Sequence, residues 1–140
     1  MKQENIASIG PAYAGQLARL NQQLIADEGH ANPMSVAELT ERMLAWLSAD
    51  YQCIGIFRAN DIAAYCLYRD DANEYYIRQL FTCRACRGQG LATALLTYLE
   101  KQLLMVKPIR LEVLSGNEAA ARFYAARGYQ VYSHTLVKRA

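Results

Sequence analysis

The stretch Arg87-Gly88-Gln89-Gly90-Leu91-Ala92 decides the fold, because it joins a strand-like run to an amphipathic helix. Residues 75–83 before it are rich in aromatic and β-branched side chains, as in a buried strand. After it, leucines recur at helical spacing at positions 91, 95, 96, 99 and 103. A glycine turn between a strand and a helix exposes backbone N–H groups at the helix N-terminus, where a phosphate group can bind.

The glycines of this turn have a mechanical role. Without Cβ atoms, Gly88 and Gly90 allow the backbone to bend sharply and to approach an anion closely, and Arg87 adds a positive charge. The spacing lacks the Gly-Lys-Ser/Thr ending of a Walker loop and the third glycine of a dinucleotide fingerprint. The turn alone therefore leaves two interpretations open, an anion site and a tight strand-to-helix turn that binds nothing.

A second pattern lies at residues 117–129, which predict a short helix and then a strand. Asn117 and the capping-box-like stretch 115–118 mark the helix start, and Gly128 marks its end. With both patterns in this order, the chain resembles the GNAT superfamily of acyl-CoA N-acyltransferases. The matching signatures are Arg-x-x-Gly-x-Ala at 87–92 and Asn-x-x-Ala-x-x-Phe-Tyr-x-x-x-Gly-Tyr at 117–129.

The resemblance implies a single domain over residues 1–140 and an α/β fold of the α+β kind. Its central sheet would be mixed and mostly antiparallel, with about six to seven strands flanked by about four helices. The local patterns predict strands at 3–9, 51–58, 62–69, 74–83, 109–114 and 129–137, with a hairpin turn at 59–61. They predict helices from Pro11 to about residue 27, after a capping box of Ser35 and Glu38, and at about 89–105.

The resemblance also implies a site for acetyl-CoA. Backbone N–H groups of the loop would hold its pyrophosphate, from Arg87, Gly88, Gln89, Gly90, Leu91 and Ala92. The pantetheine arm and the thioester would lie along the preceding strand, at Leu80, Phe81 and Thr82. Asn117 matches the family's asparagine near the pantetheine, and Tyr124 matches the tyrosine that faces the coenzyme sulfur. Tyr124 is the candidate catalytic acid, and its alternative role is that of a core aromatic beside Phe123.

The general base is not assigned by the sequence. Many relatives carry a glutamate on the strand before the loop, but here that stretch contains Gln79, which cannot take a proton at neutral pH. Glu112, His134 and a water chain remain alternatives. Acidic residues in the predicted loops could attract a cationic amine or could be ordinary solvated charges: Asp27, Glu28, Asp70 and Asp71.

Composition narrows the class of protein. The 140 residues are 53% hydrophobic, which suffices for one core, and a net charge of +2 does not indicate binding to nucleic acid or a membrane surface. No apolar run is long enough to span a bilayer and no signal-peptide layout begins the chain, so we expect a cytoplasmic protein. Cys83 and Cys86 form a Cys-x-x-Cys, but no second pair completes a metal site. We therefore expect free thiols and no metal.

Three functional classes follow. The leading prediction is an acetyl-CoA-dependent N-acetyltransferase that acts on a primary amine of a small molecule and forms a homodimer through exposed apolar surface on its last strand. The alternative is a non-catalytic acyl-CoA-binding or sensor module of the same fold. The third is an unrelated α/β domain whose loop binds a nucleotide phosphate.

Overall fold

The computed structural model describes residues 4–29 and 34–140 of the chain. Five strands form one sheet in the order β1-β2-β3-β4-β5. They are β1 (Ala7–Ser8), β2 (Tyr51–Arg58), β3 (Asp61–Asp70), β4 (Tyr75–Thr82) and β5 (Ile109–Leu111). The four helices are α1 (Ala14–Asp27), α2 (Val36–Leu47), α3 (Leu91–Leu103) and α4 (Glu118–Ala126), with short 3-10 turns η1 (Pro11–Tyr13) and η2 (Arg84–Cys86). The predicted mixed α/β fold with a mostly antiparallel sheet is confirmed.

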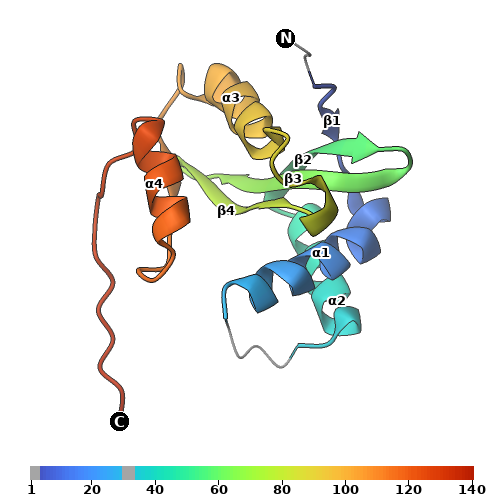
Figure 1. The fold of residues 1–140 in the computed structure, drawn as a ribbon, viewed down its shortest axis with the longest axis horizontal. Helices are drawn as coiled ribbons and strands as arrows, with labels where there is room; N and C mark the ends of the chain where they lie inside the picture. The colour runs from blue at the N-terminus through green and yellow to red at the C-terminus, as the bar shows by residue number, and fades with distance from the viewer. Residues whose placement is uncertain (1–3, 30–33) are drawn as a thin grey trace.

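Helices cover both faces of the sheet (Figure 1). On one face, α1 and α2 pack over a buried cluster that includes Leu17, Met43 and Tyr65. On the other face, α3 and α4 pack over a second cluster that includes Leu95 and Leu96. Within residues 4–29 and 34–140, no helix is long and apolar enough to cross a membrane.

Local sequence signals set several element boundaries. At the start of α2, Glu38 N–H donates to Ser35 Oγ at 3.1 Å and Ser35 N–H donates to Glu38 Oε1 at 2.9 Å, so the predicted capping box is confirmed. The hairpin turn predicted at 59–61 joins β2 to β3, and Ala59 adopts a left-handed φ of 58° there. Gly128 follows α4 with a φ of 91° and ends it as predicted.

The predicted last strand is wrong. Residues 130–140 form no strand with any part of the chain that the structure describes, and they extend away from α4 (Figure 1). The side chains of Val131, Tyr132, Leu136 and Val137 are 71–91% exposed. The local sequence at 129–137 predicted a strand, but a strand also needs another strand to pair with, which local sequence does not supply. The sheet therefore has five strands rather than the expected six to seven.

Other predicted bounds were too long. The strand predicted at 109–114 is β5, which ends at Leu111, and the helix predicted at 89–105 is α3, which runs from residue 91 to 103. The first strand predicted at 3–9 is the two-residue β1, and residue 3 lies outside the described residues. Between α1 and the capping box at Ser35, residues 30–33 lie outside the described residues.

Candidate active site

The loop between β4 and α3 presents its backbone to solvent. Gly88 and Gly90 have φ values of 80° and 77°, which favour glycine over other residues. A Cβ atom at either position would meet no atom within 4 Å, so the space beside both residues is open. Gly90 is the N-cap of α3 and gives the helix no side-chain cap. The first N–H groups of α3, at Leu91, Ala92 and Thr93, therefore have no side-chain cap, and helix N-termini of this kind can bind an anion.

The Arg87 side chain does not point freely into this opening. Its Nη2 contacts Asp27 Oδ2 at the end of α1 at 2.6 Å, and its Nε donates to the backbone carbonyl of Thr82 at 3.1 Å. Arg84 contacts the other oxygen of Asp27 at 2.9 Å. Hydrogen bonds from Arg87 and then Arg84 lower the pKa of the Asp27 carboxyl. The sequence did not predict this pairing, because 60 residues separate Asp27 from Arg87.

β4 has an open edge in the half that leads into the loop. Its parallel pairing with β5 covers Tyr75, Tyr76 and Ile77 and ends at the pair Ile77–Leu111. Of the remaining residues, 79–82 pair only with β3 among the described strands. Strand backbone groups point alternately to the two edges, so this half of β4 offers hydrogen-bonding groups to an extended ligand.

The predicted pantetheine residues lie along this open half. Leu80 faces α3, Phe81 is buried on the α1 and α2 side, and Thr82 ends the strand. The register of the β3–β4 pairing shifts by one residue between Leu67, which opposes Gln79, and Tyr68, which opposes Ile77. Arg78 is therefore the extra residue of a β-bulge. The bulge coincides with the end of the β4–β5 pairing, so it marks the point where the strands separate.

α4 carries the other two predicted site residues. Asn117 is its N-cap, and its Oδ1 accepts from the N–H of Ala120 at 3.1 Å. Tyr124 packs on the α3 side of the core, with its ring 5.1 Å from Phe123 and 5.5 Å from Tyr129 between centroids. Burial raises the pKa of the Tyr124 hydroxyl above its ordinary value. Within residues 4–29 and 34–140 that hydroxyl has no hydrogen-bond partner, so it remains available to a ligand.

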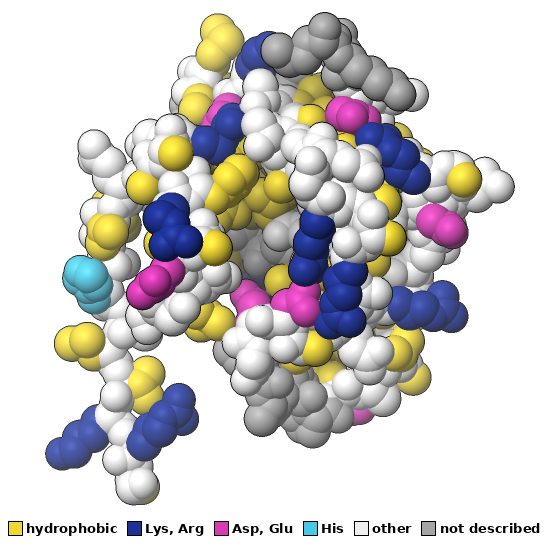
Figure 2. Space-filling model, in the orientation of Figure 1, with side chains coloured by type: hydrophobic (Ala, Val, Ile, Leu, Met, Phe, Trp, Pro, Cys, Tyr) yellow, Lys and Arg dark blue, Asp and Glu magenta, His cyan; other side chains and the backbone are white. Residues whose placement is uncertain are grey.

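Figure 2 shows the hollow between α4 and the loop after β4, with hydrophobic side chains inside it and charged side chains at one edge. The fold thus brings the glycine loop, the open edge of β4 and the Tyr124 helix to one face (Figures 1 and 2). Asn117 lies at the exposed start of α4, where its side-chain oxygen serves the helix cap.

Gln79, which cannot act as a base, and Glu112 already have hydrogen-bond partners, and His134 lies elsewhere. Gln79 is buried, and its Oε1 accepts from the Tyr65 hydroxyl at 2.7 Å. Glu112 Oε1 accepts from the Tyr76 hydroxyl at 2.8 Å. His134 lies in the exposed segment after α4. Gln79 is therefore a buried structural partner of Tyr65.

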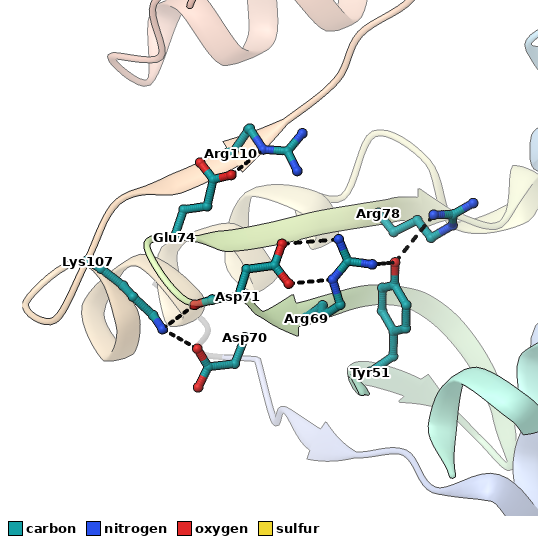
Figure 3. Close-up of polar contacts among 8 residues, drawn as sticks. All are labelled: Tyr51, Arg69, Asp70, Asp71, Glu74, Arg78, Lys107 and Arg110. Atoms are coloured by element: carbon teal, nitrogen blue, oxygen red, sulfur yellow. Dashed lines mark hydrogen bonds and ion pairs between the residues drawn. The ribbon is translucent and has the colours of Figure 1, made fainter. Parts of the chain in front are cut away.

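Asp27, Asp70 and Asp71, which the sequence suggested as attractors of a cationic amine, form ion pairs. Asp27 contacts two arginines, Asp70 contacts Lys107, and Asp71 contacts Arg69 through both oxygens at 2.5 and 3.1 Å. Figure 3 shows Asp70 and Asp71 turned toward these cations. Their charge is locally neutralised, so they make a weak attractor for a cationic substrate.

A group of cationic and aromatic residues beside β4 was missed by the sequence analysis. It comprises Arg42 and Trp46 of α2, Tyr51 of β2, Arg69 of β3 and Arg78 of β4. The i,i+4 spacing of Arg42 and Trp46 was readable in the sequence. The β-bulge that directs Arg78 toward Trp46 and Tyr51 could not be read from the sequence, since register is a property of two paired strands.

The cysteines are free thiols in two environments. Cys53 and Cys66 are buried in the sheet, whereas Cys83 precedes η2, Cys86 is its last residue, and both are half-buried. Burial raises the pKa of Cys53 to about 12, so that thiol stays protonated at neutral pH. In the parts of the chain that the structure describes, no three His, Cys, Asp or Glu side chains are grouped as metal ligands.

Comparison with known proteins gives a family and a fold. The sequence profile of the acetyltransferase (GNAT) family matches residues 19–129. A search of curated protein sequences finds no significant match.

Three similar solved structures, each under 25% identical, share the fold. A mutant of the BH1408 protein from Bacillus halodurans is 18% identical with a TM-score of 0.81, over 97% of this chain and 99% of that one. A ribosomal-protein-alanine N-acetyltransferase from Brucella melitensis biovar Abortus 2308 is 14% identical with a TM-score of 0.78, over 99% and 100% of the two chains. The aminoglycoside N-acetyltransferase AAC(6')-Iy in complex with CoA is 11% identical with a TM-score of 0.78, over 99% and 95%.

Proposed function

Because this chain belongs to the GNAT acetyltransferase family, we propose that it transfers an acetyl group from acetyl-CoA to a primary amine of a small molecule, by direct attack in a ternary complex. The observation that carries the proposal is the open edge of β4 beside a glycine loop and an uncapped helix N-terminus. Such an arrangement suits a ligand with an extended amide-containing arm and a pyrophosphate.

The residues present fit acetyl-CoA. The space on the Cβ side of Gly88 and Gly90 is open and the start of α3 has no side-chain cap, so the backbone N–H groups at Gly88, Gly90, Leu91 and Ala92 would hold its pyrophosphate. Gln89 lies between the two glycines, and Arg87 adds a cation at the loop entrance. The free backbone edge from Leu80 to Thr82 would pair with the amides of the pantetheine arm. Asn117 stands at the start of α4 as a further polar group toward that arm.

The catalytic role that we propose is carried by Tyr124. When bound, acetyl-CoA supplies an activated acetyl thioester whose C–S bond breaks as the amine nitrogen bonds to the carbonyl carbon. The Tyr124 hydroxyl donates a proton to the departing sulfur, and a proton lost by the amine to water restores the hydroxyl. Because burial raises the pKa of Tyr124, the hydroxyl is protonated at neutral pH, as this role requires. A backbone N–H of the open β4 edge stabilises the carbonyl oxygen as it gains charge.

The first test is a calorimetric titration of the protein with acetyl-CoA, with desulfo-CoA and ATP as comparison ligands. Saturable binding of acetyl-CoA with much weaker ATP binding supports the proposal, and a panel of amines is then assayed by product mass. Binding of acetyl-CoA without turnover of any amine favours the sensor module instead. Failure of both CoA ligands to bind contradicts the acyltransferase and sensor functions together.

We also propose that the protein forms a homodimer through the segment after α4. Four large apolar side chains there are 71–91% exposed, and an exposed apolar segment of this size is costly in water. The double substitution Val131→Glu with Leu136→Glu is expected to yield monomers in sedimentation velocity, whereas the unmodified chain sediments as a dimer. A monomeric unmodified chain contradicts the proposal.

A further inference from the structure

Two arginines share one indole ring beside the open half of β4. The guanidinium carbon of Arg42 and that of Arg78 each lie 4.5 Å from the ring centroid of Trp46. Arg42 and Trp46 are one turn apart on α2, and Arg78 reaches them from the bulge of β4. Arg78 Nη1 also donates to the Tyr51 hydroxyl at 3.3 Å, whose ring lies 5.4 Å from that of Trp46.

The charge of these two arginines is not neutralised locally. Within residues 4–29 and 34–140 neither Arg42 nor Arg78 forms an ion pair with a carboxylate, and their side chains donate instead to Asn21 Oδ1 and the Tyr51 hydroxyl. Arg69, by contrast, is held by both oxygens of Asp71 (Figure 3). Burial and the neighbouring charge of Arg78 lower the pKa of Arg42.

Two like charges over one ring repel each other, so the arrangement is stabilised when an anion bridges them. The Nε of Arg42 is buried and lacks a hydrogen-bond partner among the described residues. The Nη groups of Arg42 would therefore be the ones that contact the anion. Arg78 is exposed and its planar guanidinium can bind a carboxylate or phosphate through two hydrogen bonds.

The position of Arg78 links this anion site to the reaction centre. Arg78 is the first residue of β4 beyond the pairing with β5. It precedes Leu80 by two residues, which is about 6–7 Å along a strand. Its side chain lies on the Trp46 and Tyr51 side of the sheet, which α2 covers, whereas Leu80 packs toward α3. Because β4 has no β5 partner beyond Ile77, an acceptor bound beside Trp46 would approach an acetyl group held at this open edge from the face opposite to Leu80.

We propose that Arg78 and Arg42, packed against Trp46, form the anion-binding part of the acceptor site, and that the acceptor is an amine that also carries a carboxylate or phosphate group. This inference rests on the proposed acetyl transfer, since it names the acceptor class of that reaction. It also gives a charge preference opposite to the one that the acidic loop residues suggested from the sequence, because those carboxylates have cationic partners.

Trp46 is the single tryptophan of the chain, so its fluorescence reports directly on this site. The probes are four short amines of similar length: β-alanine, O-phosphoethanolamine, β-alaninamide and propylamine, each titrated to about 50 mM at constant ionic strength. We expect saturable fluorescence changes with β-alanine or O-phosphoethanolamine and none with the two probes that lack an anion. The stronger of the two anionic probes identifies the group as carboxylate or phosphate.

The variant Arg78→Gln removes one guanidinium at an exposed position. It is expected to weaken the response to the anionic probes at least about tenfold, because charge-assisted hydrogen bonds are lost. The matched control is Arg58→Gln, which makes the same change of charge at the far end of β2, where Arg58 pairs with Glu4. That control should keep the wild-type response.

Two results would overturn the inference. The first is that Trp46 fluorescence responds equally to all four probes, or to none of them. The second is that Arg78→Gln responds to the anionic probes as strongly as the wild-type chain does. Acetyl-CoA binding is measured separately by calorimetry on the same three proteins. Loss of acetyl-CoA binding in the wild-type chain contradicts the proposed function, whereas an absent anion response with intact acetyl-CoA binding contradicts only this acceptor site.

Discussion

The substitution Gly90→Asp is the most direct test of the proposed pyrophosphate site at the start of α3. Gly90 has a φ of 77°, and a Cβ there meets no atom within 4 Å, so a side chain fits without a clash. The left-handed conformation costs a non-glycine residue about 1 kcal/mol, and aspartate and asparagine tolerate it better than most residues. Both Gly90→Asp and its matched control Gly90→Asn are therefore expected to fold.

The two variants differ in charge and hardly in shape. A carboxylate about 5 Å from a phosphate, in a medium of effective dielectric constant of about 40–80, raises the free energy of binding by about 1–2 kcal/mol. This corresponds to an acetyl-CoA Kd that is about 5- to 30-fold weaker in Gly90→Asp than in Gly90→Asn. The strain at the left-handed φ is common to both variants and cancels in the comparison.

Calorimetric titration with acetyl-CoA measures both Kd values, with circular dichroism and Tm as the check on folding. The dependence on salt is a second test, because salt screens the repulsion between the carboxylate and the phosphate. The Debye length falls from about 10 Å at 0.1 M salt to about 3 Å at 1 M. The difference between the two variants should therefore shrink at high salt. Equal Kd values for folded Gly90→Asp and Gly90→Asn at low salt would refute the placement of the pyrophosphate at this loop.

Four further predictions follow from particular residues. Tyr124→Phe should lower kcat about 100-fold or more while acetyl-CoA Kd changes little, and unaltered turnover speaks against the acid role. Because burial raises the pKa of Tyr124, its proton is lost only above about pH 10, so wild-type kcat should not fall between about pH 8 and 9 through this group, and a fall there that disappears in Tyr124→Phe contradicts the raised pKa. Asp27→Asn should tighten acetyl-CoA binding a few-fold in calorimetry, since it releases Arg87 from the 2.6 Å contact, and weaker binding would mean that the contact orients Arg87. Ala59→Gly should raise the free energy of unfolding by about 0.5–1 kcal/mol in urea titration, since Ala59 has a φ of 58°, and a loss of stability excludes strain at this turn.

Some features of the fold and of the site could be predicted from the sequence, because they depend on residues that are neighbours in the chain. The glycine loop, the capping box at Ser35 and the end of α4 at Gly128 each rest on backbone conformations or hydrogen bonds that span a few residues. The family signatures at 87–92 and 117–129 are of the same local kind. They placed the loop, the helices and Tyr124 in the fold before any packing was known.

Other features depend on strand register. Arg78 reaches Trp46 because β4 contains a bulge opposite Leu67 and Tyr68, and the pairing of two strands decides where such an extra residue falls. Its environment is therefore set by residues far from it in sequence, and a pattern confined to β4 could not reveal it.

The sequence by itself determined the order of elements up to α4, the glycine turn between β4 and α3 and the membership of an acetyltransferase family, since these depend on short patterns of glycine, apolar and capping residues. Only the tertiary structure decided which charges meet: Asp27 with Arg87, Asp71 with Arg69, and Arg42 with Arg78 over Trp46. It also decided that residues 130–140 pair with no described strand. The physical reason is that charge pairing and strand pairing act between segments that folding brings together, whereas the conformation of a turn or a cap is fixed by its own few residues.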